Sequence, residues 1–218
     1  MLADSAPTLA KPAARRRAET RREILEAAWE LCRESGLTQL SLRELAARVG
    51  IRAPSLYSYF ASKDAIYDAM FAEGQREFAE AMPSLPEAKM SREDFRVGNR
   101  AFFTFCTSDP LRYQLLFQRT IPGFVPSSES YALAIANLDR LANALGSVGV
   151  KDRRYVDLWT AIMTGLTDQQ VTNDPGGNRW SELLDEAVDL FCDHLGIAPT
   201  PATTAPKSPT PTEPDRMS

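Results

Sequence analysis

A run of hydrogen-bond donors stands between residues 52 and 59. The side chains of Arg52, Ser55, Tyr57, Ser58 and Tyr59 can each donate to a phosphate oxygen or to the edge of a base. The sequence carries no nucleophile–base set, metal-ligand cluster, glycine-rich phosphate loop or paired-carboxylate motif. The donors therefore indicate binding rather than catalysis, and we expect no enzyme activity, no cofactor and no metal ion.

The residues around these donors predict two helices joined by a tight turn. Ser41 and Glu44 have the spacing of a capping box, which satisfies free amide groups where a helix begins. Gly50 is suited to end this helix, because glycine adopts a positive φ at low cost. The predicted helices, 42–49 and 54–60, form a helix-turn-helix, whose second helix enters the major groove of DNA. An αα-hairpin without a role on DNA is the alternative.

This part of the sequence resembles the signature of the TetR family of transcriptional regulators. The resemblance covers about residues 20–67 and rests on RREILEAA at 21–28, LRELA at 42–46, VGI at 49–51 and SLYSYFASKDAI at 55–66. Two positions depart from the family pattern. Arg52 stands where many relatives have a small hydroxyl side chain, and Tyr59 stands where many have histidine.

The resemblance implies a role on DNA for the matching positions. Arg43, at the start of the first helix of the motif, would approach a base edge or a phosphate. Lys63, at the start of the helix that follows the motif, would hold a phosphate. Tyr57 and Tyr59 would contact the DNA backbone or thymine methyl groups. The complete set of expected DNA-binding residues is Arg43, Arg52, Ala53, Pro54, Ser55, Tyr57, Ser58, Tyr59 and Lys63.

Helical periodicity continues through the rest of the chain, so we expect an all-α protein. Residues 15–67 are predicted to form the helix-turn-helix DNA-binding domain, and residues 68–198 a helical domain for ligand binding and dimerisation. Residues 1–14 and the Pro/Thr-rich residues 199–218 are expected to be disordered. The predicted helices lie at about 16–34, 42–49, 54–60, 63–82, 92–107, 111–119, 128–146, 152–171 and 179–195.

The resemblance also implies a homodimer and a small-molecule inducer. Helices 152–171 and 179–195 would pair with those of a second copy in a four-helix bundle. An inducer bound among helices 92–107, 111–119, 128–146 and 152–171 would shift helix 63–82 and change the separation of the two DNA-binding heads on a palindromic operator. We expect it to contact Tyr113, Phe117, Trp159 and Met163, with polar groups from Asn99, Gln114, Gln118 and Thr160.

Charge is distributed unevenly along the chain. The formal net charge is −4, but residues 11–22 contain six basic side chains against Glu19 alone. A cationic segment of this kind is typical of proteins that bind a partner with many phosphates. The Arg15–Arg17 stretch is expected either to be a solvated arm or to reach a neighbouring groove of the DNA.

The remaining features indicate a cytoplasmic protein. Cys32, Cys106 and Cys192 are far apart and lie in apolar helical patterns, so we expect buried, reduced cysteines. No run approaches the roughly 18 apolar residues of a membrane helix, and the N-terminal segment lacks the apolar run of a secretory signal. The predicted function is a repressor released from a palindromic operator by an inducer. A ligand-responsive activator and a helical small-molecule-binding protein are the alternatives.

Overall fold

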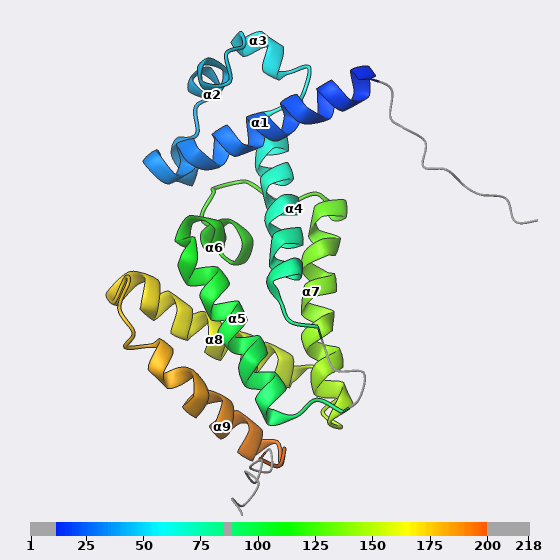
Figure 1. Cartoon of the computed structure of the whole chain (residues 1–218), viewed down its shortest axis with the longest axis vertical. Coiled ribbons are helices and arrows are strands. Elements are labelled where there is room, and N and C mark those ends of the chain that lie inside the picture. The colour runs from blue at the N-terminus through cyan, green and yellow to red at the C-terminus, as the bar shows by residue number, and fades with distance from the viewer. Residues whose placement is uncertain (1–11, 85–88, 200–218) are drawn as a thin grey trace, which may run out of the picture.

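The computed structural model describes residues 12–84 and 89–199, and regular structure within these ranges is helical. The all-α class predicted from the sequence is confirmed. Figure 1 shows α1, α2 and α3 at one end of the molecule, with α4 running from them alongside the other helices. The α-helices are α1 (Pro12–Ser35), α2 (Leu42–Arg48), α3 (Ala53–Leu56), α4 (Lys63–Ala81), α5 (Arg92–Ser108), α6 (Pro110–Phe117), α7 (Ser128–Ser147), α8 (Arg154–Asn173) and α9 (Leu184–His194). Short 3-10 turns, η1 (Leu37–Gln39) and η2 (Ser181–Leu183), precede α2 and α9.

A first hydrophobic core joins α1, α2, α3 and the N-terminal half of α4. Ile24, Ala28 and Cys32 recur every four residues along α1 and are fully buried. Leu56 and Phe60, the pair predicted to point inward from the second helix of the motif, are buried in the same core. Each large apolar side chain contributes roughly 1.5–3 kcal/mol by leaving water. Tertiary packing therefore holds α2 and α3, which are too short to be stable alone.

The turn between α2 and α3 has the predicted form. Ser41 caps α2, since its hydroxyl oxygen accepts the amide of Glu44 at 3.4 Å. Gly50 has a φ of 70°, and the amide of Ile51 donates to the carbonyl of Ala46 at 2.9 Å. This is the glycine-ended helix terminus in which one residue takes the left-handed conformation. It sets the angle at which α3 leaves α2.

The predicted helix 54–60 is too long. α3 ends at Leu56, and the next residues form a turn in which the amides of Tyr59 and Phe60 both donate to the Leu56 carbonyl. The reason is tertiary: the carbonyls of Ser58 and Tyr59 accept hydrogen bonds from arginine side chains of α1. These bonds replace the ones that a longer helix would have made.

α4 belongs to both halves of the molecule. Ser62 caps it, with the side chain accepting the Ala65 amide at 3.0 Å, as predicted. Ile66, Tyr67 and Met70 lie in the first core. Further along the same helix, the Phe78 ring packs against the rings of phenylalanines on α5 and α6, with centroids 5.3–5.9 Å apart.

α4 also approaches α6 closely. A methyl group in place of the Gly74 hydrogen would lie 2.9 Å from Cδ2 of Leu116, which is shorter than van der Waals contact. Gly74 therefore allows α4 and α6 to pack more tightly than any other residue would.

A second core lies among α5, α7, α8 and α9. The Trp159 ring of α8 packs between Phe95 of α5 and Phe191 of α9, at centroid distances of 4.9 and 4.6 Å. Charged side chains reinforce the contact between α5 and α9 in an antiparallel ladder of ion pairs. Arginines spaced by four residues on α5 face aspartates with the same spacing on α9: Arg92, Arg96 and Arg100 against Asp185, Asp189 and Asp193.

The helix ends differ from the sequence prediction at several places. α1 begins at Pro12, so residues 12–14 belong to a helix and not to the predicted disordered arm, while residues 1–11 lie outside the described residues. Proline is compatible with the first turn of a helix, which explains this start. The predicted helix 179–195 divides into η2 and α9. Of the predicted tail 199–218, all but residue 199 lies outside the described residues.

The cysteines are buried and free, as predicted. Burial raises the pKa of the Cys32 thiol to about 11 and also raises the pKa of the Cys106 and Cys192 thiols, so these groups stay protonated. None of the helices described above combines the length and the apolar character that a bilayer-spanning segment requires.

Substitution of Gly50 and of Gly98 by alanine should change the free energy of unfolding in opposite directions. Gly50→Ala should lower the free energy of unfolding by about 1 kcal/mol, because an L-residue is strained at positive φ. Gly98→Ala, inside α5 with no neighbour within 4 Å of the added methyl, should raise it by about 0.5 kcal/mol through its helix propensity. Urea denaturation at matched protein concentration measures both. Equal shifts of one sign would contradict the assignment of the turn.

Candidate functional site

The predicted DNA contacts from the second helix of the motif lie together on the outward side of α3 and the turn after it. Tyr57 is 58% exposed. Tyr59 is half-buried and packs with Ala53 against the first core. The other predicted contacts of this segment are exposed: Arg52, Pro54, Ser55 and Ser58. The Ser58 hydroxyl donates to the Ser55 carbonyl at 2.7 Å, whereas the side chains of Arg52, Ser55 and Tyr57 form no hydrogen bond with the described part of the chain.

Arg43 and Lys63 border this surface. Arg43 is exposed on the first turn of α2. Lys63 begins α4 directly after the segment, and its Nζ donates to the carbonyl of Thr38 at 3.3 Å. The Lys63 ammonium also lies 5.5 Å from the ring centroid of Tyr67, close enough for a cation–π contact. The structure thus gives the lysine a position fixed by the protein itself.

Two arginines of α1 hold the turn after α3 in place through hydrogen bonds to its backbone carbonyls. The sequence analysis did not identify this role. A guanidinium N–H of Arg17 donates to the Ser58 carbonyl, and one of Arg21 donates to the Tyr59 carbonyl. The Arg21 guanidinium also lies 4.1 Å from the ring centroid of Phe60. Their spacing of four residues on one helix face was the available signal. Arg17 is therefore part of a helix and not of the predicted solvated arm.

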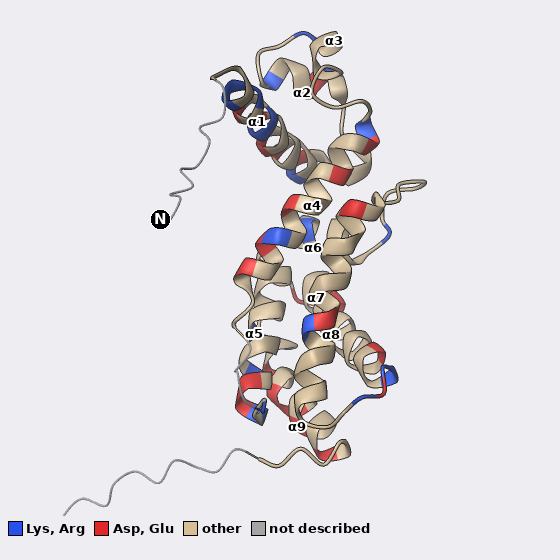
Figure 2. Cartoon of the chain, turned by 90° about the vertical axis from the view of Figure 1, so that its right-hand side faces the viewer, with Lys and Arg blue, Asp and Glu red and all other residues tan. Residues whose placement is uncertain are grey.

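Positive charge gathers on the same end of the molecule. The arginines of the first half of α1 lie beside α2 and α3, as Figure 2 shows by the blue turns at the start of α1. Cations near a surface of exposed donors favour a polyanion, even though the whole chain is acidic.

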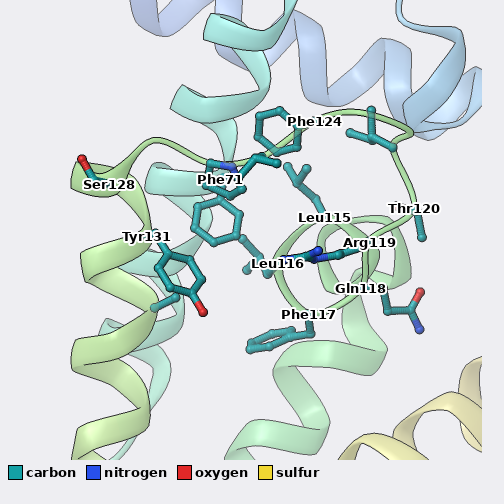
Figure 3. A pocket seen from close by; sticks show the side chains of 14 residues that line it. Phe71, Leu115, Leu116, Phe117, Gln118, Arg119, Thr120, Phe124, Ser128 and Tyr131 are labelled. Carbon is teal, nitrogen blue, oxygen red and sulfur yellow. The ribbon is translucent and has the colours of Figure 1, made fainter.

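A cavity of about 570 Å³ lies beside α4, next to the first core. Its walls come from Phe71 of α4, from α6 and from the segment between α6 and α7, and Figure 3 shows these side chains surrounding the space. The lining is mainly apolar, with a few polar groups, which is the usual composition of a small-molecule site. The lining residues are Phe71, Leu115, Leu116, Phe117, Gln118, Arg119, Thr120, Ile121, Phe124, Val125, Pro126, Ser128, Tyr131 and Ala134.

Of the four predicted ligand contacts, the structure places only Phe117 in this lining. Trp159 and Met163 lie in the second core, where the Trp159 indole donates to Oδ1 of Asn99 at 2.8 Å. Tyr113 is buried, and its hydroxyl donates to Asp168 at 2.6 Å. Burial and this hydrogen bond raise the pKa of the Tyr113 phenol. These aromatic residues are occupied by packing within the chain, which their spacing on a helix could not reveal.

Among the polar groups expected around a ligand, Gln118 is the one in the lining. Its Nε2 donates to Asp168 at 2.7 Å. Gln114 lies at a second, shallower hollow formed with Arg33 and Asp109.

The residue that joins the cavity segment to the DNA-binding end is Asp68, which the sequence analysis also missed. Asp68 lies on α4 between Tyr67 and Met70, two residues of the first core. Its carboxylate accepts the amide of Ser127 at 2.7 Å, and it also accepts the hydroxyls of Ser127 and Ser130 at 3.0 and 2.9 Å. α4 is therefore bonded to the N-terminal end of α7, at the rim of the cavity.

Comparison with known proteins agrees with this arrangement. The family model described as "Bacterial regulatory proteins, tetR family" matches residues 24–70, which span the end of α1, α2, α3 and the first part of α4. The tetracycline repressor protein class A from transposon 1721 of Escherichia coli is 28% identical over 184 residues, covering 77% of this chain and 79% of the repressor. Residues 24–70 thus form a DNA-binding domain of the TetR type, and the chain is similar to a TetR-family transcriptional regulator over most of its length.

Two further proteins show the range of this similarity. The HTH-type transcriptional activator FasR of Mycolicibacterium smegmatis is 31% identical over 106 residues, covering 47% of each chain. A tetR-family transcriptional regulator from Streptomyces coelicolor has the same fold, with a TM-score of 0.65 at 19% identity over 83% of this chain and 82% of that one. The TetR fold therefore extends beyond the DNA-binding end to the helices around the cavity.

Substitutions of Arg21 and Arg22 test whether the hydrogen bond from α1 to the Tyr59 carbonyl positions the turn after α3 for DNA binding. Arg21→Gln should weaken DNA binding about tenfold, because the Tyr59 carbonyl loses a charge-assisted donor and the turn is less well held. The slope of log Kd against log salt should stay unchanged, since no phosphate contact is lost. Arg22→Gln, which removes an exposed i,i+4 pair with Glu26, is the matched control and should have a smaller effect. A shallower salt slope in Arg21→Gln would contradict the positioning role.

Proposed function

We propose that this protein is a repressor that binds a palindromic operator as a homodimer and is released when a small molecule enters the cavity beside α4. The observation that carries the proposal is that one continuous helix serves both sites. α4 begins at Lys63, directly after the DNA-facing segment, and it contributes Phe71 to the cavity lining. A ligand that pushes on Phe71 pushes on the helix that supports the DNA-binding end.

The DNA contacts proposed are those of the outward surface described above. Arg52, Ser55 and Tyr57 would meet base edges and backbone in the major groove, while Arg43 and Lys63 would hold phosphates at its borders. Tyr59 and Ala53, being half-buried, would contribute mainly by shaping the segment. Pro54 and Ser58 complete the surface that faces the duplex.

The Asp68 carboxylate gives the cavity a second route to α4. The segment between α6 and α7 lines the cavity, and Ser127, at the end of this segment, is bonded to Asp68. A ligand that displaces this segment also displaces α4. Binding must favour the displaced arrangement, because a ligand with equal affinity for both states shifts neither.

The second copy would pack against α8 and α9. Leu158 on α8 is 46% exposed, and Leu183 and Leu190 in η2 and α9 are 38% and 66% exposed. Large apolar side chains gathered on two neighbouring helices are typical of a dimer face. A twofold assembly presents two recognition segments, which fit half-sites about one turn, or roughly 34–36 Å, apart. Because operators lie on the chromosome, this function implies a cytoplasmic location.

A ligand-responsive activator is the second candidate, because the chain is 31% identical over 106 residues to a protein named as an activator, FasR. The two candidates share DNA contacts, dimer and cavity. They differ in the effect of the bound protein on transcription. Transcription from a bound promoter, measured with and without the protein, separates them: repression lowers the transcript and activation raises it.

Binding to an operator tests the placement of the DNA surface. Fragments of the genome that encodes the chain are selected for binding, and Kd is measured on the bound site. Tyr57→Ala and Lys63→Ala should each weaken binding about tenfold or more, and loss of the Lys63 phosphate contact should reduce the salt slope by about 0.9. Lys151→Ala, at an exposed lysine in the segment before α8, is the control. If Tyr57→Ala and Lys63→Ala both bound the operator with wild-type affinity, the proposed DNA-binding surface would be refuted.

The dimer face makes a separate prediction. Leu190→Glu places a charge in the proposed interface and should convert the dimer to monomers, as measured by sedimentation velocity. Val97→Glu is the control, because Val97 is 44% exposed on α5, outside both the proposed face and the cavity lining. Operator affinity should fall with the loss of the dimer. A Leu190→Glu protein that remains dimeric would exclude this face as the interface.

A further inference from the structure

We propose that the cavity beside α4 takes an amphipathic organic anion, with its acidic group paired to Arg119 and its apolar body against the aromatic lining. This names the ligand class of the inducer site, and it rests on the proposed function only in assigning a regulatory role to the ligand. The dimensions support a small molecule, since about 570 Å³ lies within the usual range for such sites.

Arg119 carries the charge of the cavity. It is the only charged residue among the described residues that line the space. It lies two residues after the end of α6 and is exposed to solvent, and Figure 3 shows its side chain among those that line the space. A guanidinium presents several N–H donors in a planar fork that matches a carboxylate or sulfonate.

No carboxylate of residues 12–84 or 89–199 forms an ion pair with Arg119. The contrast with nearby arginines is clear, because Arg112 of α6 pairs with Glu77 at 2.8 Å and Arg33 of α1 pairs with Asp109 at 2.7 Å. The Arg119 guanidinium is therefore a cation beside an apolar cavity whose counter-ion the described part of the protein does not supply. An anionic ligand would supply it.

The N-terminal end of α7 already has an anionic partner in the carboxylate of Asp68. Ser128 of its first turn lines the space, but the carboxylate of Asp68 already accepts the Ser127 amide and the neighbouring hydroxyls. Gln118 is likewise engaged, with Asp168. These internal bonds leave the Arg119 guanidinium as the charged group of the lining without an acidic partner. The hydroxyl groups of Thr120 and Tyr131 would be hydrogen-bond partners of the ligand.

The opposite wall suits an apolar body. Phe71 of α4 is buried, and Phe117 and Phe124 stand on either side of the space in Figure 3. Tyr131 of α7 faces the same space with its ring. A neutral ligand of the same shape would bury apolar surface equally well. It would, however, displace water from the Arg119 guanidinium without replacing its hydrogen bonds, which costs free energy. The site should therefore prefer the anion.

Two fluorescent dyes that share one ring system test this preference. Anilinonaphthalenesulfonate is anionic, and phenylnaphthylamine is its neutral counterpart. The wild-type protein should bind the sulfonate at least about tenfold more tightly, as one charge-assisted pair predicts. Arg119→Gln should remove most of this preference while leaving the affinity for the neutral dye within about twofold. Arg76→Gln, an exposed arginine of α4 outside the lining, is the matched control and should retain the preference.

A second variant locates the dyes. Ala134 lines the cavity from α7, so Ala134→Trp should fill it and weaken binding of both dyes. Ala134→Leu fills less of the space. This variant is used instead of Ala134→Trp if circular dichroism shows that Ala134→Trp is unfolded. The proposal is overturned if the wild type binds neither dye or does not prefer the sulfonate. It is also overturned if Arg119→Gln weakens both dyes equally, or if the filled cavity leaves binding unchanged.

The dye measurements need no DNA, so they test the ligand class independently of the proposed function. If the dyes follow the expected pattern but no anion of this class releases the operator, the ligand class stands and the induction step is wrong. If neutral compounds release the operator while Arg119→Gln leaves their effect unchanged, regulation stands and the anion preference is wrong.

Discussion

The packing of α4 constrains the rest of this protein. Its first turns are buried with α1, α2 and α3 through Ile66, Tyr67 and Met70, and its later turns carry Phe71 and Phe78 into the ligand-binding half. A helix transmits displacement along its length because its backbone hydrogen bonds form one continuous ladder. Any change at the cavity wall is therefore felt where the recognition segment is attached. Gly74 strengthens this coupling, since it lets Leu116 of α6 approach the helix backbone closely.

The surroundings of α4 differ in how firmly they are held. At the far end, the arginine ladder of α5 and the stacked Phe95, Trp159 and Phe191 rings join α5, α8 and α9 into one packed unit. The segment 118–127, which lines the cavity, has no regular secondary structure and is joined to α4 by Asp68. A ligand in the proposed site would therefore contact a segment without regular secondary structure, while the proposed dimer face belongs to the packed unit of α5, α8 and α9. That division suits a protein that changes the spacing of two heads without dissociating.

The DNA-binding end was predicted well because its determinants are local. Ser41, Gly50 and Ser62 each act on backbone groups within a few residues, so their positions in the sequence mark helix ends directly. The periodicity of apolar residues likewise identified the buried faces of α1 and of the segment ending at Phe60. The length of α3 was wrong for the opposite reason. It depends on Arg17 and Arg21, which meet Ser58 and Tyr59 only after the chain has folded.

By itself the sequence determined the all-helical class, the helix-turn-helix, the outward donors and the family, because these follow from short-range spacing and residue type. Tertiary structure alone decided the location of the cavity, the burial of Trp159 and Met163, and the pairing state of each arginine. Spacing shows which side chains share a helix face, but not which neighbour covers that face. Contacts between residues far apart in the chain, such as Asp68 with Ser127 and Arg92 with Asp193, arise from packing. That Arg119 lines the cavity without an acidic partner among the described residues is likewise a product of packing.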